Sequence, residues 1–273
     1  MKPRTTLVYA ALCLFAPAAW ADFTIVIDPG HGGEFIAGKS DSTQLGDGAS
    51  YNNATSPGGL LEKDLALSYS LAIKQAFAES PRARELGIRV VLTREHDVHL
   101  SAMERAAVAV RESADVFLSV HFNAANKKAE GTRVYYLSAE HPRWEYMHFT
   151  NPYEARDKRF SESLAQNVAY ALQPFGANPD KRAAIPDGRE RKDGLRILGY
   201  ARMDTHLRNA ALALLEVEFL DNPKVEDWLL SDDNRPRTEK AVAEAIVTAA
   251  CDWLAQPPAD RDYVSKARKA PGR

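Results

Sequence analysis

Blocks of apolar and polar residues alternate along the chain and predict alternating strands and helices. Short apolar runs bounded by turn residues are typical of buried strands, and such runs occupy 23–28, 88–93, 115–121, 131–137 and 212–219. Helices are predicted over 62–79, where apolar residues recur at helical spacing, and over 101–112, 160–172 and 238–254. The polar stretch 176–194 contains Gly, Pro and Asp and is expected to be a loop. Because strands alternate with helices and no linker divides them, we expect a single three-layer α/β domain with a mainly parallel sheet.

The first 21 residues contain the three parts of a signal peptide in the right order. Lys2 and Arg4 form a positive start, 7–19 is apolar, and a small-x-small cleavage site ends at Ala21. The apolar run is too short to be a convincing membrane span, and a buried N-terminal helix is the alternative. We expect cleavage after Ala21, a periplasmic location and no membrane span in the mature chain.

Composition places the chain among ordinary globular proteins. Hydrophobic residues make up 45% and charged residues 26% of the 273 positions, which excludes a disordered chain. Lys+Arg total 35 and Asp+Glu total 37, so bulk charge gives no indication of nucleic-acid binding. After signal cleavage Cys251 is the remaining cysteine, so no intramolecular disulfide can form. We expect 22–256 to form the folded domain and 257–273 to form a mobile basic tail.

Two histidines stand where predicted strands end. His31 follows the strand 23–28 within the sequence Asp-Pro-Gly-His-Gly-Gly, and His121 ends the strand 115–121. Ligands of open α/β sheets bind outside the carboxyl ends of the strands, so the two imidazoles are expected to converge. The alternative for each is an ordinary polar residue at the end of a strand.

Two glutamates extend this cluster. Glu62 begins the helix 62–79 on the face that packs on the sheet, although a carboxylate there also simply suits a helix N-terminus. Glu216 lies in the apolar strand 212–219, where strand alternation places Glu218 on the same face. An edge strand with one solvated face is the alternative for Glu216. Two imidazoles and one carboxylate leave a position open on zinc, and a further carboxylate beside a metal site is the usual general base of a metallohydrolase.

Taken together and in order, six segments resemble the zinc-dependent N-acetylmuramoyl-L-alanine amidases (amidase type 3). The resemblance covers residues 23 to about 254, and its specificity comes from the order of the segments. The chain departs from the family pattern at Glu218, where a small residue is frequent, and at Asp221, where Ser is frequent. Glu218 is a candidate for tuning the pKa of Glu216 or the fit of substrate. The matching segments are 25–33, 62–67, 91–94, 118–124, 131–137 and 215–223.

The resemblance implies a twisted six-stranded sheet flanked by helices, with zinc bound by His31, Glu62 and His121. It also implies that Glu216 is the catalytic glutamate. The implied reaction is hydrolysis of the amide between N-acetylmuramic acid and L-alanine of peptidoglycan, in cell-wall turnover or cell separation. Glu216 would take a proton from the attacking water and return it to the leaving amine.

Other polar residues are candidates for supporting roles. Asp28 and Asn123 are candidates for fixing the second N–H of an imidazole that binds zinc. Arg94, like Arg133 and Arg196, is a candidate for attracting the carboxylates of the stem peptide, on the basis of charge alone. A solvated surface arginine is the alternative for each of the three.

Two other functions remain open at this point: a zinc peptidase that cuts within the stem peptide, and a non-catalytic peptidoglycan-binding protein of the same fold. The expected partners are peptidoglycan or muropeptides, and an activator protein is a further candidate; a monomer is the default. Some relatives carry an inhibitory helix over the site. The segments 34–60 and 141–159 are the places to look for such a helix in this chain. The aromatic-rich segment 141–159 is also a candidate substrate wall or lid, with packing under a loop as the alternative.

Overall fold

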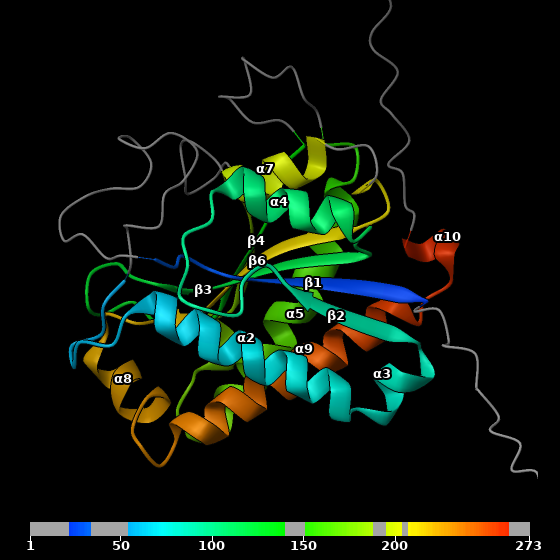
Figure 1. Ribbon diagram of the computed structural model, residues 1–273. Coiled ribbons are helices and arrows are strands. Elements are labelled where there is room, and N and C mark those ends of the chain that lie inside the picture. Colours follow the sequence, from blue (N-terminus) through cyan, green and yellow to red (C-terminus); the bar gives the residue numbers. More distant parts are fainter. Residues whose placement is uncertain (1–21, 34–53, 140–150, 188–194, 204–206, 262–273) are drawn as a thin grey trace, which may run out of the picture.

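The computed structural model describes residues 22–33, 54–139, 151–187, 195–203 and 207–261 (Figure 1). The predicted signal peptide and most of the predicted tail therefore lie outside the described residues. The strands are β1 (Phe23–Pro29), β2 (Ile88–Leu92), β3 (Val116–Asn123), β4 (Arg133–Tyr136), β5 (Ala183–Pro186) and β6 (Ala211–Phe219). The α-helices are α2 (Glu62–Glu79), α3 (Pro81–Glu85), α4 (Ala102–Arg111), α5 (Glu154–Leu172), α7 (Arg196–Met203), α8 (Pro223–Leu229), α9 (Arg235–Leu254) and α10 (Pro258–Arg261).

The strands form one six-stranded sheet in the order β2-β1-β3-β6-β4-β5. Strands β2, β1, β3 and β6 run parallel to one another. Strand β4 pairs with β6 in the antiparallel sense and with β5 in parallel. The sheet is thus mixed and mainly parallel, which confirms the predicted fold class. The carboxyl ends of the four parallel strands share one edge, where a ligand site is expected.

Helices cover both faces of the sheet and produce three layers (Figure 1). Helices α2, α5 and α9 lie on one face, where Leu65, Leu164 and Val242 join the larger apolar core. Helices α4 and α7 lie on the other face, where Ala106 and Leu198 belong to a second core. None of the described helices is long and apolar enough to cross a membrane.

The expectation that 176–194 is a loop is wrong at 183–186, which forms β5. This strand is short, pairs with β4 alone at the edge of the sheet, and buries Ile185. A strand of this length with one deeply buried side chain shows too little alternation to stand out in the sequence.

Helix α5 begins at Glu154, six residues before the predicted start at 160. The described part of the segment 141–159 therefore belongs largely to this helix. The centre of the Tyr153 ring, just before the helix, lies 4.4 and 4.9 Å from the central guanidinium carbons of Arg156 and Arg202. These contacts assign Tyr153 to packing at the start of α5.

The first residues of the predicted tail contact the domain. Pro258–Arg261 forms the short helix α10. The Arg261 guanidinium lies 4.8 Å from the centre of the Phe23 ring and donates to the Gln256 carbonyl oxygen at 3.1 Å. Residues 262–273 lie outside the described residues. Cys251, close to the end of α9, is fully buried in the larger core, as its apolar surroundings in the sequence predict.

A buried ion pair fastens α5 to α7 and to the start of β6. Nη2 of Arg202 donates to both carboxylate oxygens of Asp157, at 2.8 and 2.9 Å. Nη2 also donates to the Ala210 carbonyl oxygen, Nη1 donates to the Leu207 carbonyl oxygen, and Asp157 accepts from the Leu212 N–H. The two side chains are 1% and 0% exposed. This cluster lies at the edge of the sheet where β6 begins, opposite the carboxyl edge.

We predict that Arg202→Met destabilises the protein by about 3–5 kcal/mol, because it leaves the buried Asp157 without its closest cation. Urea denaturation measures this loss. The matched control is Arg82→Met, which breaks an ion pair between Arg82 and Asp252 whose side chains are 48% and 50% exposed; it should cost less than about 1 kcal/mol. Equal losses in the two variants would contradict the role given to burial.

Candidate metal centre and active site

The four residues singled out in the sequence meet at the carboxyl edge of the parallel strands. His31 follows β1, Glu62 is the first residue of α2, and His121 lies near the end of β3. In the register of the parallel pair β3–β6, His121 is the partner of Glu216. The four side chains therefore come together at the carboxyl ends of the parallel strands, as the sequence predicts.

The Glu62 carboxylate lies between the two imidazoles. Its Oε2 is 3.1 Å from Nε2 of His31, and its Oε1 is 2.8 Å from Nδ1 of His121. The ring centroids of the histidines are 4.8 Å apart, with the rings nearly perpendicular. Each residue offers one ligand atom, and these atoms all lie within 4.8 Å of one another.

Backbone groups hold the Glu62 carboxylate from both sides. The Phe122 N–H donates to Oε1 at 3.1 Å, and the Ala54 N–H donates to Oε2 at 3.0 Å. Burial favours the neutral carboxylic acid, but the charge of His31 and the hydrogen bond from His121 outweigh burial and hold the pKa of Glu62 well below its usual range. Burial opposes charge on His121 as well, and Glu62 outweighs it, so the pKa of His121 is raised. The site therefore keeps Glu62 ionised.

Glycine is required next to His31 because the chain runs close to His121. A Cβ atom at Gly30 would lie 2.4 Å from the His121 ring, which no side chain can accommodate. The Gly30 N–H donates to the Val120 carbonyl oxygen at 2.9 Å and continues the β1–β3 pairing. His31 itself has a φ of 53°, in the left-handed region that non-glycine residues seldom adopt.

Glu216 lies beside this group within the sheet. This residue is only 3% exposed, and its immediate neighbours along β6 are apolar. Its negative charge contributes to the raised pKa of His121. Because paired residues of adjacent strands face the same side, the Glu216 carboxylate and the His121 imidazole share one face of the sheet.

The donor set fits zinc. Two imidazole nitrogens and a carboxylate oxygen occur together in catalytic zinc sites, where three protein ligands leave a further position open. His31, Glu62 and His121 form the one such group found among the described residues. The residues present can thus hold the metal that the family resemblance implies.

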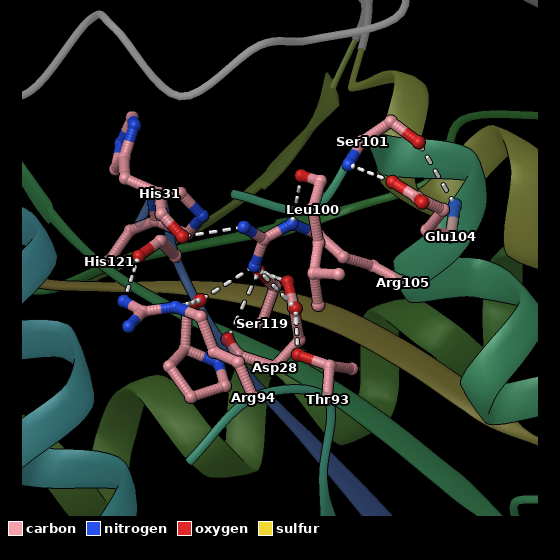
Figure 2. Close-up of polar contacts among 12 residues, drawn as sticks. Asp28, His31, Thr93, Arg94, Leu100, Ser101, Glu104, Arg105, Ser119 and His121 are labelled. Carbon is pink, nitrogen blue, oxygen red and sulfur yellow. Dashed lines mark hydrogen bonds and ion pairs between the residues drawn. The ribbon is translucent and has the colours of Figure 1, made fainter. Parts of the chain in front are cut away.

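Asp28 occupies a different position from the one expected. Its carboxylate accepts from Thr93 Oγ1 and from Nη1 of Arg105 at Oδ1, and from Ser119 Oγ at Oδ2, at distances of 2.5, 2.8 and 2.6 Å (Figure 2). These donors, together with the charge of Arg105, outweigh burial and lower the pKa of Asp28. Asp28 therefore anchors Arg105 rather than an imidazole.

The expectation that Arg94 attracts substrate, and the alternative of a solvated surface arginine, are both inconsistent with the structure. Arg94 is 3% exposed and donates to the carbonyl oxygens of Pro29, Gly30, Lys63 and His96. Burial, followed by the charge of Arg105, lowers its pKa to about 10, so it stays charged at neutral pH.

Asn123 and Arg133 lie beside the end of β6. Asn123 Oδ1 accepts from the Ala124 N–H at 2.9 Å. The Arg133 guanidinium lies 5.6 Å from the centre of the Phe219 ring. The side chain of Arg196 lies outside the described residues.

Strict alternation along β6 ends between Glu216 and Phe219. The register with β3 shifts there, because Asn123 pairs with Phe219 where unbroken pairing from His121–Glu216 would give Glu218. Oε2 of Glu218 accepts from the Gly131 N–H at 2.7 Å and from the Phe219 N–H at 3.2 Å. Because of this irregularity, strand alternation no longer places Glu218 on the same face of the sheet as Glu216.

Sequence reasoning did not single out Arg105. This residue lies in α4 and is 5% exposed. Its only signal in the sequence is the capping box of Ser101 and Glu104, which fixes the start of the helix at Ala102, three residues before it. Nothing in the helical pattern indicates that its guanidinium reaches β1.

An open α/β sheet with a His–Glu–His group and a buried glutamate at its carboxyl edge defines a candidate metallohydrolase. The family model described as N-acetylmuramoyl-L-alanine amidase matches residues 25–248. The chain belongs to this family, as the order of its sequence segments predicts.

Comparison with individual proteins agrees with this assignment. The chain is 27% identical over 246 residues to the N-acetylmuramoyl-L-alanine amidase AmiC of Neisseria meningitidis, which covers 81% of this chain and 51% of that relative. The chain thus spans about half the length of this curated relative. Among solved structures, AmiC2 of Nostoc punctiforme matches with a TM-score of 0.59 and 21% identity, covering 86% of this chain and 98% of that one. The CwlD amidase of Clostridioides difficile, in complex with the GerS lipoprotein, matches with a TM-score of 0.54 and 20% identity over 84% and 98% of the two chains. These structures confirm the fold.

We predict that Glu218 makes the stability of the protein fall as pH rises from about 4.5 to 7. Burial raises the pKa of Glu218 from 4.5 to about 7, against the hydrogen bonds from Gly131 and Phe219; Glu130 adds to the rise and Arg133 opposes it. In this window the folded state keeps a proton that the unfolded state has lost, so the free energy of unfolding decreases. The shift corresponds to about 3 kcal/mol.

Glu218→Gln stays uncharged and should remove this part of the pH dependence. Urea denaturation of both proteins at pH 4.5 to 7.5 measures the difference. The exposed Glu79→Gln serves as the control and should leave the profile of the wild type unchanged. Parallel profiles for the wild type and Glu218→Gln would show that Glu218 titrates normally.

Proposed function

We propose that this protein is a zinc-dependent N-acetylmuramoyl-L-alanine amidase, which hydrolyses the amide between N-acetylmuramic acid and L-alanine of peptidoglycan. The observation that carries the proposal is the convergence of His31, Glu62 and His121 with the buried Glu216 in a member of this family. Each of these residues comes from a different element at one edge of the sheet.

In this proposal His31, Glu62 and His121 hold zinc. When bound, zinc supplies a Lewis acid that polarises the scissile carbonyl and lowers the pKa of water. Hydrogen bonds from the Phe122 and Ala54 N–H groups hold the Glu62 carboxylate in place as a ligand. The absence of a side chain at Gly30 leaves room for the His121 ring.

Glu216 is the proposed general base and acid. Its carboxylate takes a proton from the attacking water and then delivers that proton to the departing amine of L-alanine. Burial strengthens the electrostatic interaction of Glu216 with the reacting atoms, because little water screens the charge. Glu216 pairs with His121 across β3 and β6, so the sheet sets the distance between the base and the metal site.

The setting of the reaction is part of the proposal. Export by the predicted signal peptide 1–21 would deliver the enzyme to the periplasm, where peptidoglycan or muropeptides are available. The CwlD amidase, which shares the fold, was solved in complex with a lipoprotein. That complex supports an activator protein as a partner of this chain, which we take to be a monomer.

We predict that the protein 22–273, loaded with zinc, releases stem peptides beginning at L-alanine from purified peptidoglycan. Mass spectrometry of the soluble products identifies them. A chelator should abolish release and added zinc should restore it. Peptides cut within the stem would indicate a peptidase, and intact muropeptides from a zinc-loaded protein would contradict the proposed enzyme.

We predict that Glu216→Gln lowers kcat by about 10²–10⁴-fold, the usual contribution of a general acid–base residue. Zinc content, measured by atomic absorption, should stay that of the wild type, because Glu216 is not a proposed ligand. Glu112→Gln, in a surface ion pair with Arg89, is the control and should retain activity. A Glu216→Gln variant that keeps more than about a tenth of the rate would exclude Glu216 as the base.

A further inference from the structure

Two buried arginines bind the backbone segment that presents His31 (Figure 2). Arg94 donates from Nε to the Pro29 carbonyl oxygen at 3.0 Å and from Nη2 to the Gly30 carbonyl oxygen at 2.7 Å. Arg105 donates from Nη1 to the Pro29 oxygen at 2.7 Å and from Nη2 to the His31 oxygen at 2.5 Å. The carbonyl oxygens of three consecutive residues therefore point at guanidinium groups.

Arg94 also binds the segment that presents Glu62. The same Nη2 atom that binds Gly30 donates to the carbonyl oxygen of Lys63 at 2.8 Å. One guanidinium nitrogen thus joins the loop after β1 to the first turn of α2. Each joined residue is adjacent in sequence to a proposed metal ligand.

The link that Arg94 forms between these two segments holds a backbone conformation that is unfavourable on its own. His31 has a left-handed backbone, which costs free energy in a non-glycine residue and persists only where the surroundings impose it. On the far side of His31, Nζ of Lys63 donates to the Gly33 carbonyl oxygen at 2.5 Å and to Asp97 at 2.6 Å, and Asp97 accepts the Gly33 N–H. The strained residue is held by cations before and after it.

Resting on the proposed function, we propose that Arg94 is a positioning residue for the metal centre, which holds the segments of His31 and Glu62 at a fixed separation through the Gly30 and Lys63 carbonyl oxygens. Arg105, anchored by Asp28, secures the His31 side of the same bridge. Partners that orient metal ligands typically change metal affinity by 10–100-fold when removed. Here the orientation acts through the backbone rather than through the imidazoles.

The matched control lies at the opposite edge of the sheet. Arg202 is as buried as Arg94, at 3% exposure, and also donates to backbone carbonyl oxygens, of which it binds two. It forms a carboxylate pair with Asp157 much as Arg105 does with Asp28. A general loss of stability is therefore common to variants of all three arginines, whereas a loss of metal affinity is expected at Arg94 and Arg105 alone.

The test measures the zinc dissociation constant of the full chain by competition with a chromophoric chelator. The variants are Arg94→Lys, Arg105→Lys and Arg202→Lys. Lysine keeps the charge but has a single nitrogen, which cannot reach the four carbonyl oxygens that Arg94 binds. We expect Arg94→Lys to weaken zinc binding at least about 10-fold, and Arg202→Lys to leave it within about 2-fold. Thermal unfolding of the metal-free proteins records the accompanying loss of stability.

Three results would overturn the inference. The first is an unchanged zinc affinity in folded Arg94→Lys, and the second is an equal loss of zinc affinity in Arg94→Lys and Arg202→Lys. The third is a loss of zinc affinity that is proportional, across the variants, to their loss of thermal stability. If Arg94→Lys does not fold, the zinc affinity of Arg105→Lys tests the inference for the segment that carries His31. A wild-type chain that binds no zinc would instead overturn the proposed metal centre. The failure of the inference and the failure of the proposed function are therefore distinguishable.

Discussion

The active-site edge of this protein depends on the binding of backbone carbonyl oxygens by buried arginines. Strand β1 ends at Pro29, the Gly30 N–H makes one further hydrogen bond to β3, and the chain leaves the sheet at the proposed metal ligand His31. Strand pairing does not hold the backbone beyond that point. There the guanidinium groups of Arg94 and Arg105 bind the Gly30 and His31 carbonyl oxygens with charge-assisted hydrogen bonds, which are stronger than neutral ones. The ionised Asp28 balances part of the positive charge and makes its burial tolerable.

The functional candidates found from the sequence are residues that differ clearly in type from their neighbours along the chain. His31 stands among glycines, and Glu216 stands in an otherwise apolar strand. Glu62 and His121 stand at the ends of predicted elements, and the parallel topology brings such ends to one edge of the sheet. For these residues a local pattern together with the α/β architecture was sufficient. The order of the matching segments then indicated the family.

The sequence was insufficient where a role depends on long-range contacts. Arg94 was a candidate for attracting substrate carboxylates on the basis of charge alone, with a solvated surface arginine as the alternative. Its actual role depends on carbonyl oxygens of Gly30 and Lys63, which are distant from it in the sequence. The contact of Arg105 with the end of β1 could not be predicted for the same reason. The edge strand β5 was missed because four residues paired on one side bury too little to show a pattern.

The irregularity at the end of β6 separates two carboxylates that regular alternation would place together. Glu216, before the irregularity, stays in register with His121 and shares its face of the sheet. Glu218, after it, accepts N–H groups from Gly131 and Phe219 and secures the connection between β3 and β4. An oxygen that already accepts two backbone donors is poorly placed to remove a proton from water, whereas Glu216 lies beside the proposed metal ligand His121. The irregularity of the strand thus gives each carboxylate its own partners, and these partners favour Glu216 as the proposed base.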